Sequence, residues 1–145
     1  KVDATVRCAV LCWPVIDPLG RYRYAKAGLA GDNEKLKKSA VDWVACHDQY
    51  WPNEAAMEES NPTQALVRGE KTPTPPVLYL QGTADLAHPV PHREQFISLY
   101  RKAGGRVELH LFEGVGEAFI TTDPNSPQAK SAIEKIIEFV HRELD

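Results

Sequence analysis

Two short turns, each placed after an apolar segment, carry carboxylates in positions suited to chemistry. Asp85 ends the turn "GTAD" after residues 76–81, and Glu117 lies inside "GVGEAF" after residues 106–112. Glycines in such turns let the backbone bend sharply and approach other groups closely. In α/β proteins, binding and catalytic groups gather at the carboxyl ends of parallel strands. A carboxylate at each of two such ends can orient a base, act as a base or bind a ligand.

Three apolar segments are expected to form the sheet that positions these turns. Residues 5–13, 76–81 and 106–112 are largely apolar on both faces, a pattern typical of strands buried on both sides of a parallel sheet. Helical spacing follows each of them along the chain. This alternation predicts an α/β fold of three layers, α/β/α, around a mostly parallel sheet.

The helices are predicted from apolar spacing together with capping residues. A helix is expected over residues 32–50 with Asp32 as its N-cap, and a second, short helix is expected after the cap residue Asn53. Two more are predicted, one over 92–103 and one that begins after Ser126 and runs to the C-terminus. These helices are the elements that would cover the sheet and hold its turns in place.

The connection between the first two predicted strands is unusually long, at about sixty residues. Its start, residues 14–24, is rich in turn formers and predicts a loop. The helices after that loop indicate an insertion over about 18–72, placed as a cap over a site. Because three strands of this kind would leave a long apolar edge exposed, we interpret residues 1–145 as the C-terminal part of a larger domain. The alternative is a compact three-stranded domain.

The two turns, in this order and about thirty residues apart, resemble those of the α/β-hydrolase fold. The resemblance is to the C-terminal half of the esterase and lipase-like members and extends over nearly the whole chain. Their late strands end in a His-Gly-x-x-Asp type turn and then in a Gly-x-Gly-His-Gly-Phe type turn. Gln81 stands where the first histidine is usual. The positions that match are Gly82, Thr83, Ala84, Asp85, Gly114, Gly116 and Phe119.

This resemblance implies hydrolysis of a small-molecule carboxylic ester by a Ser–His–Asp triad, through an acyl-serine intermediate. Asp85 falls at the position of the triad acid. The nucleophile motif G-x-S-x-G is absent from the sequence, so the serine is expected upstream of residue 1. The implied partner is the N-terminal half of the same hydrolase, on the same or a separate polypeptide. Glu117 holds the histidine's place, although a glutamate, with a usual pKa of ~4.3, is a weaker base than an imidazole, with ~6.5.

Each site residue has more than one interpretation. Asp85 is the triad acid or the polar residue of an Asx-type turn. Glu117 is a substitute base, a ligand-binding acid or a solvated loop carboxylate. His88 supplies an imidazole from an unusual direction or is a surface histidine beside Pro89. The alternative to an esterase is therefore a catalytically impaired pseudo-hydrolase that binds a small apolar ligand. A third interpretation is a purely structural half-domain.

Aromatic residues around the predicted cap are candidates for a ligand pocket. They would line an apolar space for an acyl or aryl group, or pack the cap helices together. His47 and His141 lie on predicted helices and are interpreted as surface residues, whereas His110 is interpreted as a partnered histidine of the third strand. The candidate pocket residues are Trp13, Trp43, Tyr50 and Trp51.

The composition excludes several classes of protein. Hydrophobic residues make up 43% of 145 residues, which fits one globular domain. A net charge of −3 with both signs interspersed argues against nucleic-acid and membrane partners. Cys8 and Cys12 would lie ~13 Å apart on a strand that rises ~3.3 Å per residue, too far for a disulfide. We therefore expect a reduced, cytoplasmic protein. We also expect it to hold no cofactor and no metal.

Overall fold

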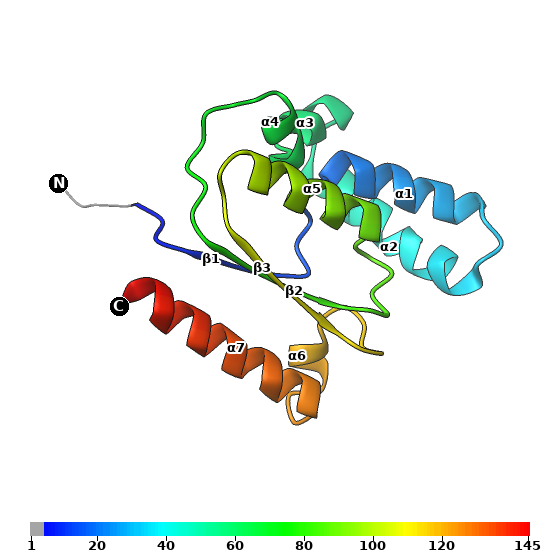
Figure 1. Ribbon diagram of the computed structural model, residues 1–145. Coiled ribbons are helices and arrows are strands. Elements are labelled where there is room, and N and C mark those ends of the chain that lie inside the picture. The colour runs from blue at the N-terminus through cyan, green and yellow to red at the C-terminus, as the bar shows by residue number, and fades with distance from the viewer. Residues whose placement is uncertain (1–4) are drawn as a thin grey trace. The chain divides into compact units, whose positions relative to one another are not determined.

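The computed structural model describes residues 5–145, whose helices and strands alternate as expected for an α/β protein (Figure 1). These residues fall into two compact units. The sheet unit comprises the described residues up to Pro14, then Lys71–Asp85 and Tyr100–Asp145, and the helical unit comprises Val15–Glu70 and Leu86–Leu99. In chain order the elements are β1 (Ala9–Cys12), α1 (Pro18–Ala30), α2 (Glu34–Tyr50), α3 (Glu54–Glu59), α4 (Pro62–Val67), β2 (Val77–Gly82), α5 (Val90–Lys102), β3 (Val107–Phe112), α6 (Phe119–Thr122) and α7 (Pro127–Leu144).

The sheet has the strand order β1-β2-β3, and both neighbouring pairs are parallel. Val77 is the residue of β2 that pairs with Ala9 of β1 and with Val107 of β3. The predicted α/β class and parallel sheet are therefore confirmed. The second and third strands lie within one residue of their predicted bounds, whereas β1 is shorter than the apolar segment that predicted it.

The core of the sheet unit lies between the sheet and the two C-terminal helices. Figure 1 shows α6 and α7 along one face of the strands. Ser126 caps α7 as predicted, because its hydroxyl accepts from the backbone N–H of Ala129 at 3.2 Å, and Pro127 occupies the first turn. The fully or nearly buried apolar residues of this core are Leu78, Leu80, Phe112, Phe119, Ala129, Ala132 and Phe139.

The loop predicted over residues 14–24 is wrong, because most of that segment forms the start of α1. Asp17 is the N-cap: its carboxylate accepts from the backbone N–H of Gly20 at 2.8 Å, and Pro18 sits in the first turn. An Asp-Pro pair favours a helix start as readily as a turn, because proline needs no N–H there. Asn61 also donates to Asp17, at 2.6 Å, which ties α1 to the start of α4.

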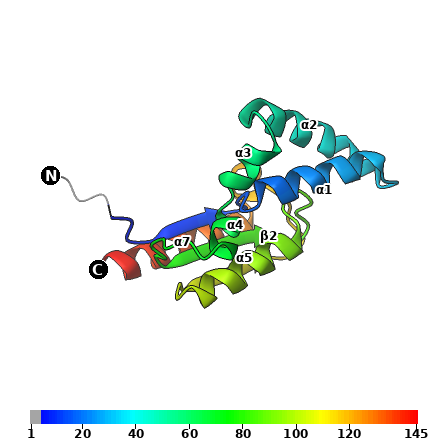
Figure 2. The same ribbon diagram turned by 90° about the horizontal axis from the view of Figure 1, so that it is seen from above.

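The helix predicted over 32–50 is confirmed as α2, although its N-cap is Asn33 and not Asp32. The amide oxygen of Asn33 accepts from the backbone N–H of Leu36 at 3.0 Å. Figure 2 shows α1 and α2 side by side. They approach closely where Gly28 faces α2, since a Cβ there would lie 3.0 Å from Leu36 and 3.6 Å from Ala40. Asn53 caps α3 as predicted.

His47 is buried, so its interpretation as a surface residue is wrong. Its side chain lies on the face of α2 that packs inward and is only 2% exposed. Nδ1 lies 2.8 Å from the carbonyl oxygen of Trp43, and the ring stacks on Tyr22 with centroids 5.7 Å apart. The ring of Trp51 also packs against that of His47, with centroids 5.1 Å apart. The imidazole is therefore a core element of the helical unit.

We expect this burial to make the protein less stable in weak acid. Loss of hydration is the main cause that lowers the pKa of His47; the Trp43 carbonyl and Asp48 act against the shift, and the Arg21 charge adds to it. The unfolded chain would take up a proton near pH ~6.5 while the folded chain resists it, so stability falls as pH drops below ~6.5.

Urea unfolding between pH 7.5 and pH 5 measures this effect. His47→Gln should flatten the slope of unfolding free energy against pH in that range, whereas His141→Gln, at an exposed position, should leave it unchanged. An unchanged slope in His47→Gln would show that other groups cause the acid loss.

Candidate active site

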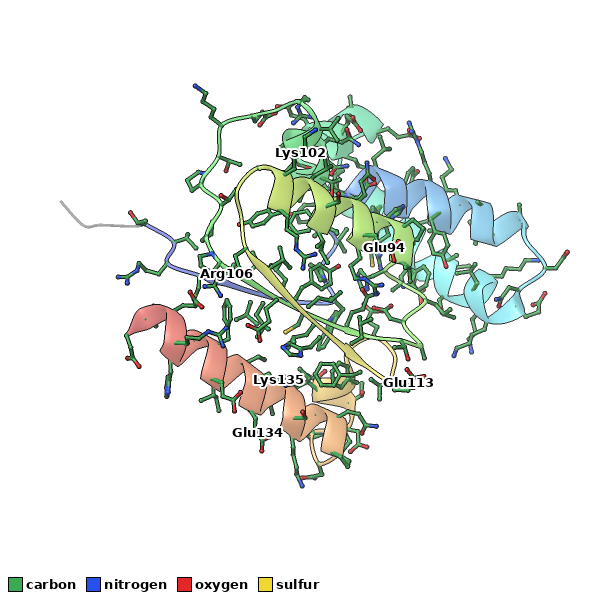
Figure 3. All side chains as sticks on the ribbon, viewed as in Figure 1. Glu94, Lys102, Arg106, Glu113, Glu134 and Lys135 are labelled. Carbon is green, nitrogen blue, oxygen red and sulfur yellow. The ribbon has the colours of Figure 1, made fainter. Side chains whose placement is uncertain are left out.

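The turns after β2 and β3 begin side by side because the last residues of the two strands, Gly82 and Phe112, are paired in the sheet. Figure 3 marks the far end of β3 by Glu113, opposite Arg106 at its start. Three hydrogen bonds join the two turns. They run from the Thr83 N–H to the Phe112 carbonyl at 2.9 Å, from the Gly114 N–H to the Thr83 hydroxyl at 2.9 Å, and from the Ala84 N–H to the Val115 carbonyl at 3.0 Å.

Asp85 is held close to the end of β2 by its own turn. Its backbone N–H donates to the carbonyl of Gly82 at 3.3 Å, and its carboxylate accepts from the side-chain amide of Gln81 at 3.4 Å. Gln81 is almost completely buried, which fixes the amide that faces the carboxylate. Asp85 itself is half-buried. Its environment is therefore that of a carboxylate with a defined orientation, while its role as the triad acid stays a prediction.

Glu117 is exposed and lies in the neighbouring turn, directly before a left-handed residue. That residue is Ala118, with φ 60° and ψ 18°, and it begins α6 without a side-chain cap. Gly114, earlier in the turn, also has a positive φ of 73°. The two predicted site carboxylates thus come from adjacent, hydrogen-bonded turns of one unit. The role of Glu117 as a base or a ligand-binding acid stays a prediction.

Replacing Ala118 by glycine should stabilise the protein by about 0.5–1 kcal/mol. The left-handed conformation brings the Cβ of an L-residue too close to its carbonyl oxygen, and glycine avoids that cost of about 1–2 kcal/mol, although it gains entropy in the unfolded chain. Thermal or urea unfolding measures the change. As a control, Ala129→Gly inside α7 should destabilise instead, since Ala129 is a buried helical residue. A loss of stability in Ala118→Gly would contradict the prediction.

Trp13 brings an aromatic side chain to the same end of the sheet. It directly follows β1, and its backbone N–H donates to the carbonyl of Leu80 at 2.8 Å. Its φ of 40° is unusual for a bulky residue. The indole meets the ring of Phe119 edge-on, with centroids 5.5 Å apart. Trp13 therefore packs against the first residue after the turn that holds Glu117.

The other three predicted pocket residues lie in the helical unit, where their contacts are mainly with each other and with helix side chains. The guanidinium of Arg21 lies 5.3 Å from the ring centre of Trp43. The indole N–H of Trp51 donates to the Ser60 hydroxyl at 2.7 Å. Tyr50 meets Trp51 edge-on at 4.4 Å and is 77% exposed. Packing between helices accounts for these contacts, and a role in a ligand pocket stays a prediction.

The structure contradicts the sequence-based interpretation of one histidine and confirms that of another. His88 is only 5% exposed, so the alternative of a surface histidine is wrong, and its role as a substitute base stays a prediction. His110 is partnered as predicted, with Nε2 2.8 Å from Oε1 of Glu108. Burial lowers the pKa of His92, with the Asp17 carboxylate opposing the shift. Within residues 5–145, no three His, Cys, Asp or Glu side chains converge as a metal site would require.

A hollow of about 310 Å³ lies in the helical unit. The Arg23 guanidinium and the Glu54 carboxylate form an ion pair across its lining, at 2.9 Å. Charged walls do not suit an apolar acyl group. The hollow is lined by Leu19, Arg23, Glu54, Ala55 and Glu58.

In the described part of the chain, no helix is both long and apolar enough to cross a membrane.

The chain matches a protein-family model and several esterase structures. The model of the dienelactone hydrolase family matches residues 37–144. An esterase from the planctomycete Thermogutta terrifontis has a TM-score of 0.60 and 22% identity, over 96% of this chain and 43% of that chain. Carboxyl esterase 2 from the fungus Tuber melanosporum has a TM-score of 0.64 and 21% identity, over 90% of this chain and 42% of that chain. The esterase from Pyrobaculum calidifontis has a TM-score of 0.64 and 19% identity, over 90% of this chain and 41% of that chain.

These matches agree with the fold described above. No curated protein matches the chain. The chain spans less than half the length of each of the three esterases. The parallel sheet, its flanking helices and the matched family together confirm the α/β-hydrolase resemblance found in the sequence. The chain belongs to the dienelactone hydrolase family.

Proposed function

We propose that this chain is part of a carboxylic-ester hydrolase whose serine nucleophile lies on the N-terminal half of the same hydrolase. The observation that carries the proposal is the hydrogen-bonded pair of turns at the ends of β2 and β3, which holds Asp85 and Glu117 at neighbouring strand ends. Membership of a hydrolase family and the similarity to three esterases support it. Its substrate would be a small-molecule ester.

In this proposal the base takes the proton of the serine hydroxyl while the oxygen attacks the ester carbonyl. The tetrahedral intermediate then expels the alcohol, which receives that proton, and leaves an acyl-serine. Water, deprotonated by the same base, attacks the acyl-serine; the tetrahedral intermediate then expels the serine oxygen, which receives that proton, and the carboxylic acid is released. Glu117 would be the base, and it would act with a charge present before the reaction starts, which opposes the developing oxyanion. Because an ionised carboxylate has no proton to donate, Asp85 would not orient Glu117 as a triad acid orients an imidazole.

The second candidate function is a pseudo-hydrolase that binds a small apolar ligand without turnover. The exposed carboxylate of Glu117 at the position of the family's histidine favours it, because an exposed carboxylate is a poor base at neutral pH.

Hydrolysis of short aryl esters by the complete protein separates these two functions. Turnover that depends on the proposed base, so that Glu117→Gln lowers it, would support the hydrolase. Saturable binding of the same esters without release of the phenol would support the pseudo-hydrolase. Neither turnover nor binding would contradict both.

A further inference from the structure

The strand β3 forms an edge of the sheet, since β2 is its only neighbouring strand in the part of the chain that the structure describes. The edge of a sheet presents backbone N–H and C=O groups that can pair with another strand. This edge is also open to solvent: Glu108, Leu109 and His110 are half-buried, and Leu111 is 47% exposed. The strand that fits it is decided by the backbone groups and side chains that point outward.

Hydrogen bonds show which backbone groups of β3 point outward. The Thr83 N–H donates to the Phe112 carbonyl at 2.9 Å, so the backbone of Phe112 faces the β2 side. Because these groups alternate in direction along a strand, every second residue of β3 faces away from β2. In agreement, the Val107 carbonyl accepts from the Arg101 guanidinium at 3.0 Å, which leaves its second lone pair for another donor. The outward-facing residues are Val107, Leu109 and Leu111.

The side chains of β3 differ in chemistry between its two faces. Glu108 and His110 share the face toward α7, where Glu108 pairs with Arg142. Nε2 of His110 lies 2.8 Å from Oε1 of Glu108. Since side chains alternate along a strand, Leu109 and Leu111 share the opposite face. A strand that pairs with β3 therefore meets a carboxylate and an imidazole on one face and aliphatic side chains on the other.

A second copy of β3, running antiparallel around a two-fold axis at Leu109, matches both patterns. Leu109 then opposes Leu109 of the second copy, and Leu111 opposes Val107 of the second copy. All of these residues face outward, so each opposed pair exchanges two N–H···O bonds. Between them, Glu108 opposes His110 of the second copy at the position where side chains lie closest. Aliphatic pairs and pairs of opposite charge at such positions stabilise antiparallel strands.

Other positions of the axis fit less well. An axis at His110 also pairs the whole strand, but it places two imidazoles opposite each other and Glu108 opposite Phe112. An axis at Glu108 places two carboxylates opposite each other, which is destabilising. Axes nearer either end leave much of the strand unpaired. Charged side chains usually keep other strands away from an edge. Here their order makes a second copy the complementary partner.

We propose that two copies of the complete protein form a dimer in which their β3 strands pair antiparallel around a two-fold axis at Leu109. The two sheets then continue into one, and the same surface of each copy forms the interface. The occupant is a second copy because the order of charged and aliphatic side chains on β3 is complementary to itself. This inference goes beyond the esterase function and does not depend on it.

Substitution of Leu111 tests the backbone pairing in the complete protein. Leu111→Pro removes an outward N–H, and an edge strand tolerates proline at such a position because no bond to β2 is lost. It should raise the dissociation constant of the dimer about tenfold or more, since each copy loses a donor and gains a ring that obstructs the other strand. Leu111→Ala is the matched control, because it removes the same side chain and keeps the N–H; it should raise the constant much less. Light scattering over a range of protein concentrations measures the constant.

Exchange of the two polar side chains tests the register of the strands. His110→Glu would place a carboxylate opposite Glu108 of the second copy at two symmetric positions, and it should shift the protein to monomer. The double variant Glu108→His/His110→Glu restores an opposite pair at both positions and should restore the dimer. A general loss of stability would not be reversed in this way, and the melting temperature of each variant shows whether it is folded. A folded double variant that stays monomeric would contradict the axis at Leu109.

Hydrogen exchange identifies the occupant of the edge. The amides of Leu109 and Leu111 should be protected in the dimer and should exchange quickly after dilution to monomer. Protection that persists in the monomer would mean that another segment of the complete protein pairs with β3, and the proposal would be wrong. A protein that is monomeric at every concentration, or a dimer that Leu111→Pro and His110→Glu leave intact, would overturn it as well. None of these measurements uses ester hydrolysis, so an inactive esterase would not affect them.

Discussion

Replacing Glu117 by histidine is expected to raise ester hydrolysis by the complete protein about 10²–10⁴-fold, the usual contribution of a general base. An imidazole with a pKa near ~6.5 accepts the serine proton and returns it to the leaving alcohol at neutral pH. It is also neutral before the reaction, so the developing oxyanion does not meet a carboxylate. The rate should rise with pH up to about 7.5 as the imidazole loses its proton. Initial rates with short aryl esters measure the effect.

Asp85 should be required for this gain. The Glu117 and Asp85 turns are bonded to each other, so a histidine at position 117 would have a carboxylate from the adjacent turn available to orient its ring. Adding Asp85→Asn should remove much of the increase, because the amide favours the wrong tautomer of the imidazole. The double variant therefore tests the pairing of the two positions, and not only the basicity of one side chain.

Glu113→His provides a matched control for the substitution at position 117. Glu113 is an exposed glutamate at the end of β3, in the same connection as Glu117 (Figure 3). Since it lies before the turn that the family uses for its histidine, Glu113→His should leave the rate unchanged. If the parent protein is already a fast esterase and Glu117→His slows it, Glu117 is itself the working base. The pseudo-hydrolase would then be excluded.

Much of the fold was predictable because local patterns and long-range packing agree there. The strand over 76–81 is a continuous apolar segment, and the strand over 106–112 alternates Glu108 and His110 with apolar residues; both form within one residue of these bounds. The last helix starts at the predicted cap, Ser126. By contrast, residues 14–24 contain turn formers that are also the cap and first turn of α1. Whether an Asp-Pro pair begins a helix is decided by the following residues and their packing.

The candidate site was predictable in its position but less so in its details. That Asp85 and Glu117 come from neighbouring turns follows from parallel strands that end at one edge. The left-handed backbone of Ala118 and the positive φ of Trp13 are set by tertiary contacts, and neither residue type signals them. The prediction that His47 is a surface residue was wrong because a histidine on an amphipathic helix can face either solvent or the core. The packing of α1 against α2 decides which of the two it faces.

Replacing Gly82 by alanine is expected to destabilise the protein by about 3 kcal/mol or more, at the upper end of the usual cost of overpacking. Gly82 is the last residue of β2, and the turn after β3 crosses directly over it. A Cβ at this position would lie 2.1 Å from the carbonyl oxygen of Val115 and 2.9 Å from that of Gly116. These are backbone atoms, so no rotation of a side chain can relieve the contact. The two turns would have to separate.

Gly116→Ala is the matched control, because it adds the same methyl group within the same pair of turns. A Cβ on Gly116 would meet nothing closer than the Ala84 carbonyl oxygen at 3.8 Å, and its φ lies outside the left-handed region. Gly116→Ala should therefore change the unfolding free energy by less than about 1 kcal/mol. Urea unfolding of both variants gives the comparison. Equal effects of the two would show that the turns move apart at little cost.

Separation of the turns would also change the site, and this consequence can be measured apart from stability. In the Glu117→His background, Gly82→Ala should remove most of the gained esterase activity at temperatures where the protein is still folded. The reason is that the hydrogen bond from the Ala84 N–H to the Val115 carbonyl sets the spacing between the two turns that carry positions 85 and 117. If activity persists in the folded double variant, orientation of the base does not depend on this contact. Asp85 would then act without the close packing that Gly82 permits.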